Sequence, residues 1–97
     1  MLVVVSYDVS TESAEGRKRL RRVAKLCLRH GQRVQFSVFE CQIDSGQLLM
    51  FKKLLLDEID QAQDSIRLYQ LGNKYENKIE HYGVKDSFDL DKDTLML

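Results

Sequence analysis

The stretch LVVVSYDVST (residues 2–11) begins with four aliphatic residues, three of them β-branched, and then reaches a tyrosine and an aspartate. β-Branched and aromatic residues favour strands, so we predict a strand over Leu2–Tyr7. Alternate side chains of a strand point to opposite faces, and both faces are apolar here. Asp8 shares the face of Val4, so an acidic residue ends a strand that otherwise reads as buried.

Two interpretations of Asp8 follow. Aspartate is a preferred residue in turns and at helix N-caps, and Asp8 stands where the chain must turn. Alternatively, Asp8 is a metal-binding or catalytic carboxylate. If the strand lies near the two-fold axis of a dimer, two Asp8 carboxylates converge, and a divalent cation between them relieves their repulsion. Magnesium suits such a site, because it needs only one or two protein carboxylates and binds substrate phosphates directly.

The rest of the chain alternates helical and β patterns. Polar residues 10–13 precede an amphipathic helix, whose apolar stripe recurs at Leu20, Val23, Ala24 and Cys27. Gly31 is expected to stop this helix. A capping box of Asp44 and Gln47 predicts a second helix, which continues through Leu48, Phe51, Leu55, Ile59 and Ala62.

The β-rich segment Gln32–Ile43 is either one long strand or two short ones. Residues 65–71 and 78–84 are predicted strands, separated by a turn at residues 72–73, and residues 85–97 form an acidic and then apolar tail. The order β-α-β(β)-α-β-β in one short domain predicts a ferredoxin-like α+β sandwich, with both helices on one face of an antiparallel sheet. The domain spans residues 1–84. Because the other face is also apolar, we expect a sheet-to-sheet homodimer to cover it.

Charge is balanced overall but unevenly distributed. The 97 residues include 15 basic and 15 acidic side chains, and eight of the basic ones lie between Arg17 and Arg33. Four share the helix face opposite the apolar stripe: Lys18, Arg22, Lys25 and Arg29. Such a stripe is either a solvated helix face or a binding surface for a phosphate backbone. The absence of a partner acid four residues away favours nucleic-acid contact.

Several classes of protein are not indicated. Cys27 and Cys41 show no zinc-binding spacing and are expected to be buried, reduced thiols. The sequence contains no phosphate-binding glycine-rich motif and no nucleophile elbow. It also shows no signal peptide and no apolar run long enough to span a membrane, so we expect a cytoplasmic protein.

Three stretches together resemble the CRISPR-associated (Cas) family-two proteins, the small subunits that accompany the CRISPR integrase in spacer acquisition. They are YDVS after the first strand, RLRRVAKLC on the first helix and GQRVQFSVFEC at residues 31–41. IRLYQLGNKYENKIEHYG (residues 66–83) is similar to the subtype I-C branch. The resemblance implies a ferredoxin-like homodimer whose C-terminal strand reaches the partner's sheet, and the tail is expected to dock on the partner subunit. It also favours two short strands joined at Ser37-Val38.

The resemblance implies a metal-dependent endonuclease on RNA or duplex DNA. Asp8 from each protomer would bind Mg²⁺ or Mn²⁺, and a metal-bound water would attack the phosphodiester. Tyr7, Ser37 and Phe39 match positions that support the site or the interface. The expected nucleic-acid contacts are Lys18, Arg22, Lys25, Arg29 and Arg33.

Two alternatives stay open. Some members of the family act as non-catalytic dimeric scaffolds that bridge integrase dimers and hold duplex DNA. Asp8 is the only strong acidic candidate in each chain. A nuclease normally needs further groups that activate water and stabilise the leaving oxygen, which favours the scaffold. A more distant alternative is a toxin-type ribonuclease of the same fold.

Overall fold

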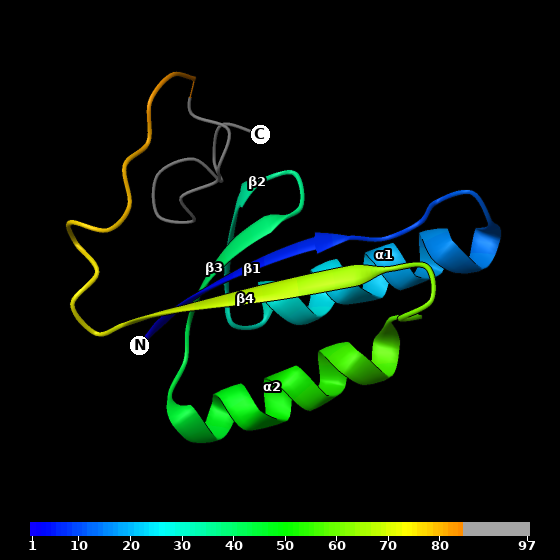
Figure 1. Ribbon diagram of the computed structural model, residues 1–97, viewed down its shortest axis with the longest axis horizontal. Coiled ribbons are helices and arrows are strands. Elements are labelled where there is room, and N and C mark those ends of the chain that lie inside the picture. Colours follow the sequence, from blue (N-terminus) through cyan, green and yellow to red (C-terminus); the bar gives the residue numbers. More distant parts are fainter. Residues whose placement is uncertain (85–97) are drawn as a thin grey trace.

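The computed structural model describes residues 1–84, which form a four-stranded antiparallel sheet and two helices. The elements are β1 (Leu2–Asp8), α1 (Ala14–Leu28), β2 (Gly31–Gln35), β3 (Val38–Gln42), α2 (Ser45–Glu58) and β4 (Ser65–Gly72). The strand order is β2-β3-β1-β4, and the two helices run side by side along the sheet (Figure 1). This is the predicted ferredoxin-like arrangement, and it places β1 at the centre.

The core lies between the helices and one face of the sheet. Val3, Val5 and Tyr7 of β1 are buried there, whereas Val4 and Ser6 are only half-buried on the other face. The core also takes in Val23 and Cys27 of α1, Phe39 and Cys41 of β3, and Phe51 and Leu55 of α2. The alternation expected along β1 is therefore confirmed, and one sheet face is left without a covering layer of helices.

Both cysteines are free and buried. Burial raises the pKa of the Cys27 thiol to about 12 and that of Cys41 to about 11. Such thiols remain protonated at neutral pH and act as small apolar residues. Among the helices of residues 1–84, none has the length and apolar character needed to cross a membrane.

The helix starts follow the predicted capping. Ser13 caps α1 by accepting a hydrogen bond from the Gly16 N–H at 3.0 Å. At α2 both hydrogen bonds of the capping box between Asp44 and Gln47 are formed. The predicted end of α2 is wrong, because the helix stops at Glu58 rather than reaching Ala62: Ile59 adopts an extended backbone, and the Asp60 side chain accepts from Ala62 N–H in a turn.

The segment from Gln32 to Ile43 forms two strands, with the turn at Phe36–Ser37, one residue earlier than expected. Gly31 does not stop α1, which ends at Leu28 with Arg29 as its C-cap. Instead it begins β2, where a Cβ would lie 1.9 Å from the Glu40 carbonyl oxygen. Glycine is required there because two backbones approach closely.

Within the single chain, residues 78–84 form no strand, although they are expected to pair with the sheet of another protomer. A turn closed by the hydrogen bond from Lys78 N–H to the Tyr75 carbonyl directs the chain across the uncovered sheet face instead of along a strand edge. Without a neighbouring strand to pair with, this segment has no ladder to join. The expectation for the tail, residues 85–97, falls outside the described residues.

A buried carboxylate, Asp64, joins the loops at the end of β1 and the start of β4. Its side chain is fully buried and accepts the Arg19 guanidinium at 2.7 Å, the Ser10 N–H at 3.0 Å and the Asp60 N–H at 2.9 Å. Burial alone would raise the pKa of Asp64, but the hydrogen bonds from Arg19 and the two backbone groups outweigh it, so the pKa lies below its ordinary value. The loop that follows Asp8 is thereby fixed against α1.

Replacing Asp64 should therefore weaken the fold in a pH-dependent way. We expect Asp64→Asn to lower the free energy of unfolding by about 2 kcal/mol at pH 7, since buried donors lose a charged acceptor. A carboxyl with a depressed folded-state pKa stabilises the protein above its ordinary pKa and loses that contribution as the pH falls through the folded value. The difference between Asp64→Asn and wild type should thus shrink in acid. Urea unfolding from pH 7 to pH 3 measures this difference in the free energy of unfolding, with exposed Asp57→Asn as the control. A difference that stays constant over this range would contradict the stabilising role of the Asp64 carboxylate.

Candidate functional site

Asp8 is the last residue of β1, and it is exposed. The alternation of β1 puts its side chain on the uncovered sheet face together with Val4 and Ser6. Across the sheet, Asp8 pairs with Ser65, the first residue of β4. Within residues 1–84 no ion pair or hydrogen bond engages the Asp8 carboxylate, so its oxygens are available to a ligand.

The β2–β3 turn lies beside Asp8 on its other flank. The Tyr7 N–H donates a 3.1 Å hydrogen bond to the Ser37 carbonyl oxygen, which fixes the turn against the end of β1. Phe36, in the same turn, is 92% exposed. Ser37, which is expected to support the site, therefore lies close to Asp8.

Tyr7 and Phe39 lie below this site, on the helix-facing side of the sheet. Tyr7 is almost fully buried, Phe39 is completely buried, and their rings stack with centroids 6.1 Å apart. Burial raises the pKa of the Tyr7 phenol, although the nearby Arg33 acts in the opposite direction. In this position the two rings anchor the end of β1 through packing, and neither contributes to the uncovered face.

Arg33 also lies on the helix-facing side, where its guanidinium stacks 5.1 Å above the centre of the Phe39 ring. Its Nε is buried without a hydrogen-bond partner within residues 1–84. The structure thus separates Arg33 from the other expected nucleic-acid contacts, which lie on the outer surface of α1. Arg33 pairs with Phe39 across β2 and β3, which places both side chains on the same face of the sheet.

The outer surface of α1 carries the predicted basic stripe. Lys18, Arg22, Lys25 and Arg29 are all exposed. Arg21, which the sequence analysis did not select, joins three of them around a shallow groove of about 490 Å³ whose floor includes Ala24 and Leu28.

Two cations of the stripe have acidic partners, contrary to the expectation from the sequence. Lys18 lies 3.8 Å from Glu15, and Arg22 lies 3.3 Å from Glu58 of α2. A search for acids four residues away could not find either partner, because Glu15 is three residues away and Glu58 lies on another helix. Both pairs are exposed and contribute little stability, so the cations remain available to an anionic ligand.

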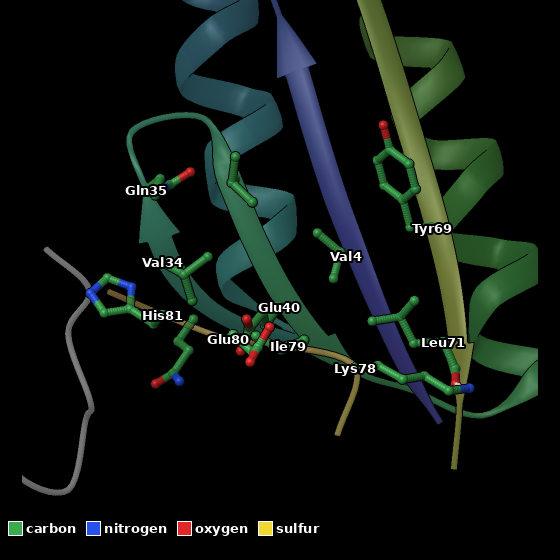
Figure 2. Close-up of a pocket in the computed structure, with 12 residues that line it drawn as sticks. Val4, Val34, Gln35, Glu40, Tyr69, Leu71, Lys78, Ile79, Glu80 and His81 are labelled. Atoms are coloured by element: carbon green, nitrogen blue, oxygen red, sulfur yellow. Dashed lines mark hydrogen bonds between the residues drawn. The ribbon is translucent and has the colours of Figure 1, made fainter. Parts of the chain in front are cut away.

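The uncovered sheet face holds a groove of about 520 Å³ that the sequence analysis missed, because it assigned residues 78–84 to a strand. Figure 2 shows Val4, Tyr69 and Leu71 along the sheet, with Lys78 to His81 passing over its lower end. Val34, Val38 and Glu40 complete much of the wall. Burial raises the pKa of the Glu40 carboxyl, which lies among these apolar side chains.

A metal site within one chain is not formed by the described residues: no cluster of three or more histidine, cysteine, aspartate or glutamate side chains exists between residues 1 and 84. Asp8 offers one carboxylate, and carboxylate oxygen is the donor that Mg²⁺ prefers. The donor type fits magnesium or manganese.

Comparison with known proteins agrees with this geometry. Residues 1–79 match the family model described as CRISPR associated protein Cas2. A protein of Halalkalibacterium halodurans named CRISPR-associated endonuclease Cas2 is 56% identical over 91 residues, which is 94% of this chain and 95% of the relative. A Chlorobaculum tepidum protein named CRISPR-associated endoribonuclease Cas2 is 52% identical over the same shares of the two chains.

Solved structures extend the similarity to three dimensions. The crystal structure of Streptococcus pyogenes Cas2 at pH 6.5 superposes with a TM-score of 0.76 and 51% identity, covering 86% of this chain and all of that one. A hypothetical protein, TT1823, from Thermus thermophilus gives a TM-score of 0.71 at 31% identity, with 86% and 90% covered. With the family model, the sequence identities and the fold in agreement, this chain belongs to the CRISPR-associated Cas2 family.

Proposed function

We propose that this protein is a metal-dependent nuclease of CRISPR spacer acquisition, acting in the cytoplasm and belonging to subtype I-C. The observation that carries the proposal is the exposed Asp8 carboxylate at the end of the central strand, free of ion pairs within residues 1–84 and flanked by the Ser37 turn and Ser65. Relatives of this chain are named endonuclease or endoribonuclease. The subtype rests on the sequence of residues 66–83.

The working unit is a homodimer formed by the uncovered sheet faces. That face presents Val4, Val38, Tyr69 and Leu71, and Tyr69 remains 43% exposed in the single chain. Burial of this apolar surface against a second copy is favourable. Since Asp8 lies on the same face at the end of β1, a two-fold axis near β1 brings two Asp8 carboxylates together. Residues 78–84, unpaired in the single chain, are available to join the partner's sheet.

In this arrangement, each residue has a defined task. The two Asp8 side chains would hold Mg²⁺ or Mn²⁺, and the metal would supply charge neutralisation at the scissile phosphate and a more acidic water. The exposed cations of α1 hold the nucleic-acid backbone through charge, which carries no sequence information. Tyr7, Phe39 and Arg33 keep the end of β1 in place from the helix side.

A second function is favoured by the scarcity of acids at the site. Within residues 1–84, Asp8 is the one exposed carboxylate at the end of β1, and a hydrolytic site usually needs further groups to activate water and stabilise the leaving oxygen. A dimeric scaffold that bridges integrase dimers and holds duplex DNA requires only the dimer and the cations of α1.

Asp8→Asn distinguishes these functions. Loss of a residue that only hydrogen-bonds a metal ligand lowers activity by about 10- to 100-fold. Asp8 would contact the metal directly, so we expect Asp8→Asn to lower the cleavage rate by about 100-fold or more. Stability should stay within about 0.5 kcal/mol, because Asp8 is exposed. Labelled duplex DNA and single-stranded RNA are incubated with Mg²⁺, Mn²⁺ or chelator, with exposed Asp57→Asn as the matched control.

Equal cleavage by wild type and Asp8→Asn would remove Asp8 from the mechanism. If neither protein cleaves, but both support integration with the integrase partner, the scaffold is the function.

The dimer is tested by placing a charge on the uncovered face. Tyr69→Asp should convert the dimer to a monomer, since a carboxylate would be buried at the interface without a partner. Leu49→Asp, at an apolar position on α2 that is 71% exposed and lies away from this face, should leave the mass unchanged. Light scattering after size-exclusion chromatography gives the mass of each variant; a Tyr69→Asp dimer would rule out this interface.

The role of α1 is tested through salt dependence. Each phosphate contact contributes about 0.9 to the slope of log K against log salt concentration, so Lys25→Gln with Arg29→Gln should reduce the slope for duplex DNA by up to about 1.8. Lys52→Gln with Lys53→Gln on α2 removes the same charge and should leave the slope unchanged. A slope that is insensitive to the α1 substitutions would exclude this surface from backbone contact.

A further inference from the structure

The exposed cations of α1 and the Asp8 carboxylate lie on opposite sides of the sheet. α1 packs against β2 and β3 on the helix-facing side, and its basic stripe is exposed on the outer surface of that layer. Asp8 is on the uncovered face. A phosphate that the cations of α1 bind therefore lies across the sheet from Asp8, and a phosphate at Asp8 needs a cation on the uncovered face itself.

Arg67 of β4 provides a cation on that face. Arg33 and Arg67 are the two basic residues in the four strands of residues 1–84, and Arg33 lies on the helix-facing side above Phe39. The neighbours of Arg67 in β4, Ile66 and Leu68, pack against the core. Because side chains alternate along a strand, Arg67 points to the uncovered face, where it is exposed.

The register of β1 and β4 places Arg67 beside Asp8. Asp8 pairs with Ser65, and Ser6 pairs with Arg67, with no irregularity between these two pairs. Asp8 and Arg67 are therefore diagonal neighbours on one face of the sheet. Diagonal neighbours in an antiparallel pair lie about 7–8 Å apart, which is within reach of a long side chain. A phosphate held over the Asp8 carboxylate is thus within reach of the Arg67 guanidinium.

The Arg67 guanidinium is available to an anion. It stacks 5.4 Å from the centre of the Tyr69 ring, and Figure 2 shows Tyr69 on the uncovered face. Stacking on an aromatic ring uses the flat surface of a guanidinium and leaves the N–H donors at its edge free. Within residues 1–84 no ion pair joins Arg67 to Asp8 or to another acid. Both side chains therefore keep their charges for a ligand.

We propose that Arg67 binds the phosphodiester at the Asp8 site and stabilises the charge that develops on it during hydrolysis. The binding needs no metal, whereas the catalytic role rests on the proposed function. A planar guanidinium can donate two parallel N–H bonds to phosphate oxygens. Arg67 is then one of the groups that a nuclease needs in addition to the Asp8 carboxylates.

The hydrolysis defines what Arg67 does. The oxygen of a water molecule forms a bond to phosphorus, and the bond between phosphorus and the leaving oxygen breaks with its electron pair passing to that oxygen. The leaving oxygen receives the proton that the water gives up. Negative charge on the phosphate oxygens is greatest between these events, and a fixed donor aimed at developing charge lowers the barrier.

Binding of a phosphodiester is tested without metal and without turnover. Full-length protein with isotope-labelled arginine nitrogens is titrated in chelator with a dinucleotide that contains one phosphodiester, and the Nε–Hε signal of Arg67 is followed by NMR. Arg67→Lys identifies this signal by its loss. We expect the signal to shift with the phosphodiester and not with the methylphosphonate analogue, which has the same bases but no charge. No shift, or an equal shift with both dinucleotides, would overturn the proposal.

Cleavage kinetics test the catalytic role. Removal of one donor to developing charge lowers kcat by about 100- to 1,000-fold, so Arg67→Gln should lower kcat by about 100-fold or more and change KM much less. Arg67→Lys keeps the charge but loses the paired donors, and its kcat should lie between the two. Lys53→Gln removes an exposed cation of α2 and should cleave as wild type does. Equal kcat for wild type and Arg67→Gln would exclude Arg67 from catalysis.

The alternative role of Arg67 is an ion pair with the partner subunit across the dimer interface. Light scattering after size-exclusion chromatography separates the two roles, and we expect Arg67→Gln to remain a dimer. Loss of the dimer in this variant would make Arg67 an interface residue and overturn the proposal. If wild type cleaves neither DNA nor RNA with any metal, the proposed nuclease function fails, and the NMR titration still decides whether Arg67 binds a phosphodiester.

Discussion

The Asp64 carboxylate is the interaction on which the geometry of the candidate site depends. It joins three segments that are distant in the sequence: the loop after β1 through Ser10, α1 through Arg19, and the loop before β4 through Asp60. Because Asp8 and Ser65 are cross-strand neighbours, this buried hub lies at the same end of the sheet as the exposed carboxylate. One aspartate is fully satisfied and structural, and another, close by, is left open to solvent. The chain thus uses the same residue type for opposite purposes at one sheet end.

The second determinant is that two helices cover only one face of a four-stranded sheet. The alternation of side chains along β1 then decides which residues are buried. The core contains Val3, Val5 and Tyr7, and the opposite face presents Val4, Ser6 and Asp8. The tyrosine before the aspartate belongs to the packing that holds the strand end, through its stack on Phe39. At the end of this one strand, the buried Tyr7 therefore packs in the core, and the next residue, Asp8, is exposed at the candidate site.

Much of this could be predicted because it depends on local pattern. The β1 alternation, the Asp44–Gln47 capping box and the apolar stripe of α1 each follow from residues within a few positions of one another, and the structure confirms them. The errors arose where distant segments meet. The Arg22–Glu58 and Arg19–Asp64 pairs join different elements, and no spacing rule reveals them. The position of Arg33 beside Phe39 likewise depends on the pairing of β2 with β3. Residues 78–84, whose expected partner is the sheet of another protomer, form no strand within the single chain.

The outer edge of β4 has a consequence for the behaviour of the protein in solution. This strand runs for eight residues without a proline, and Arg67 is its only charged residue. In the part of the chain that the structure describes, no strand pairs with that edge. A long edge with little charge is a template for uncontrolled pairing between molecules. Any assembly that covers β4 therefore protects the protein against aggregation, and dilution or overexpression without its natural neighbours exposes the chain to that risk.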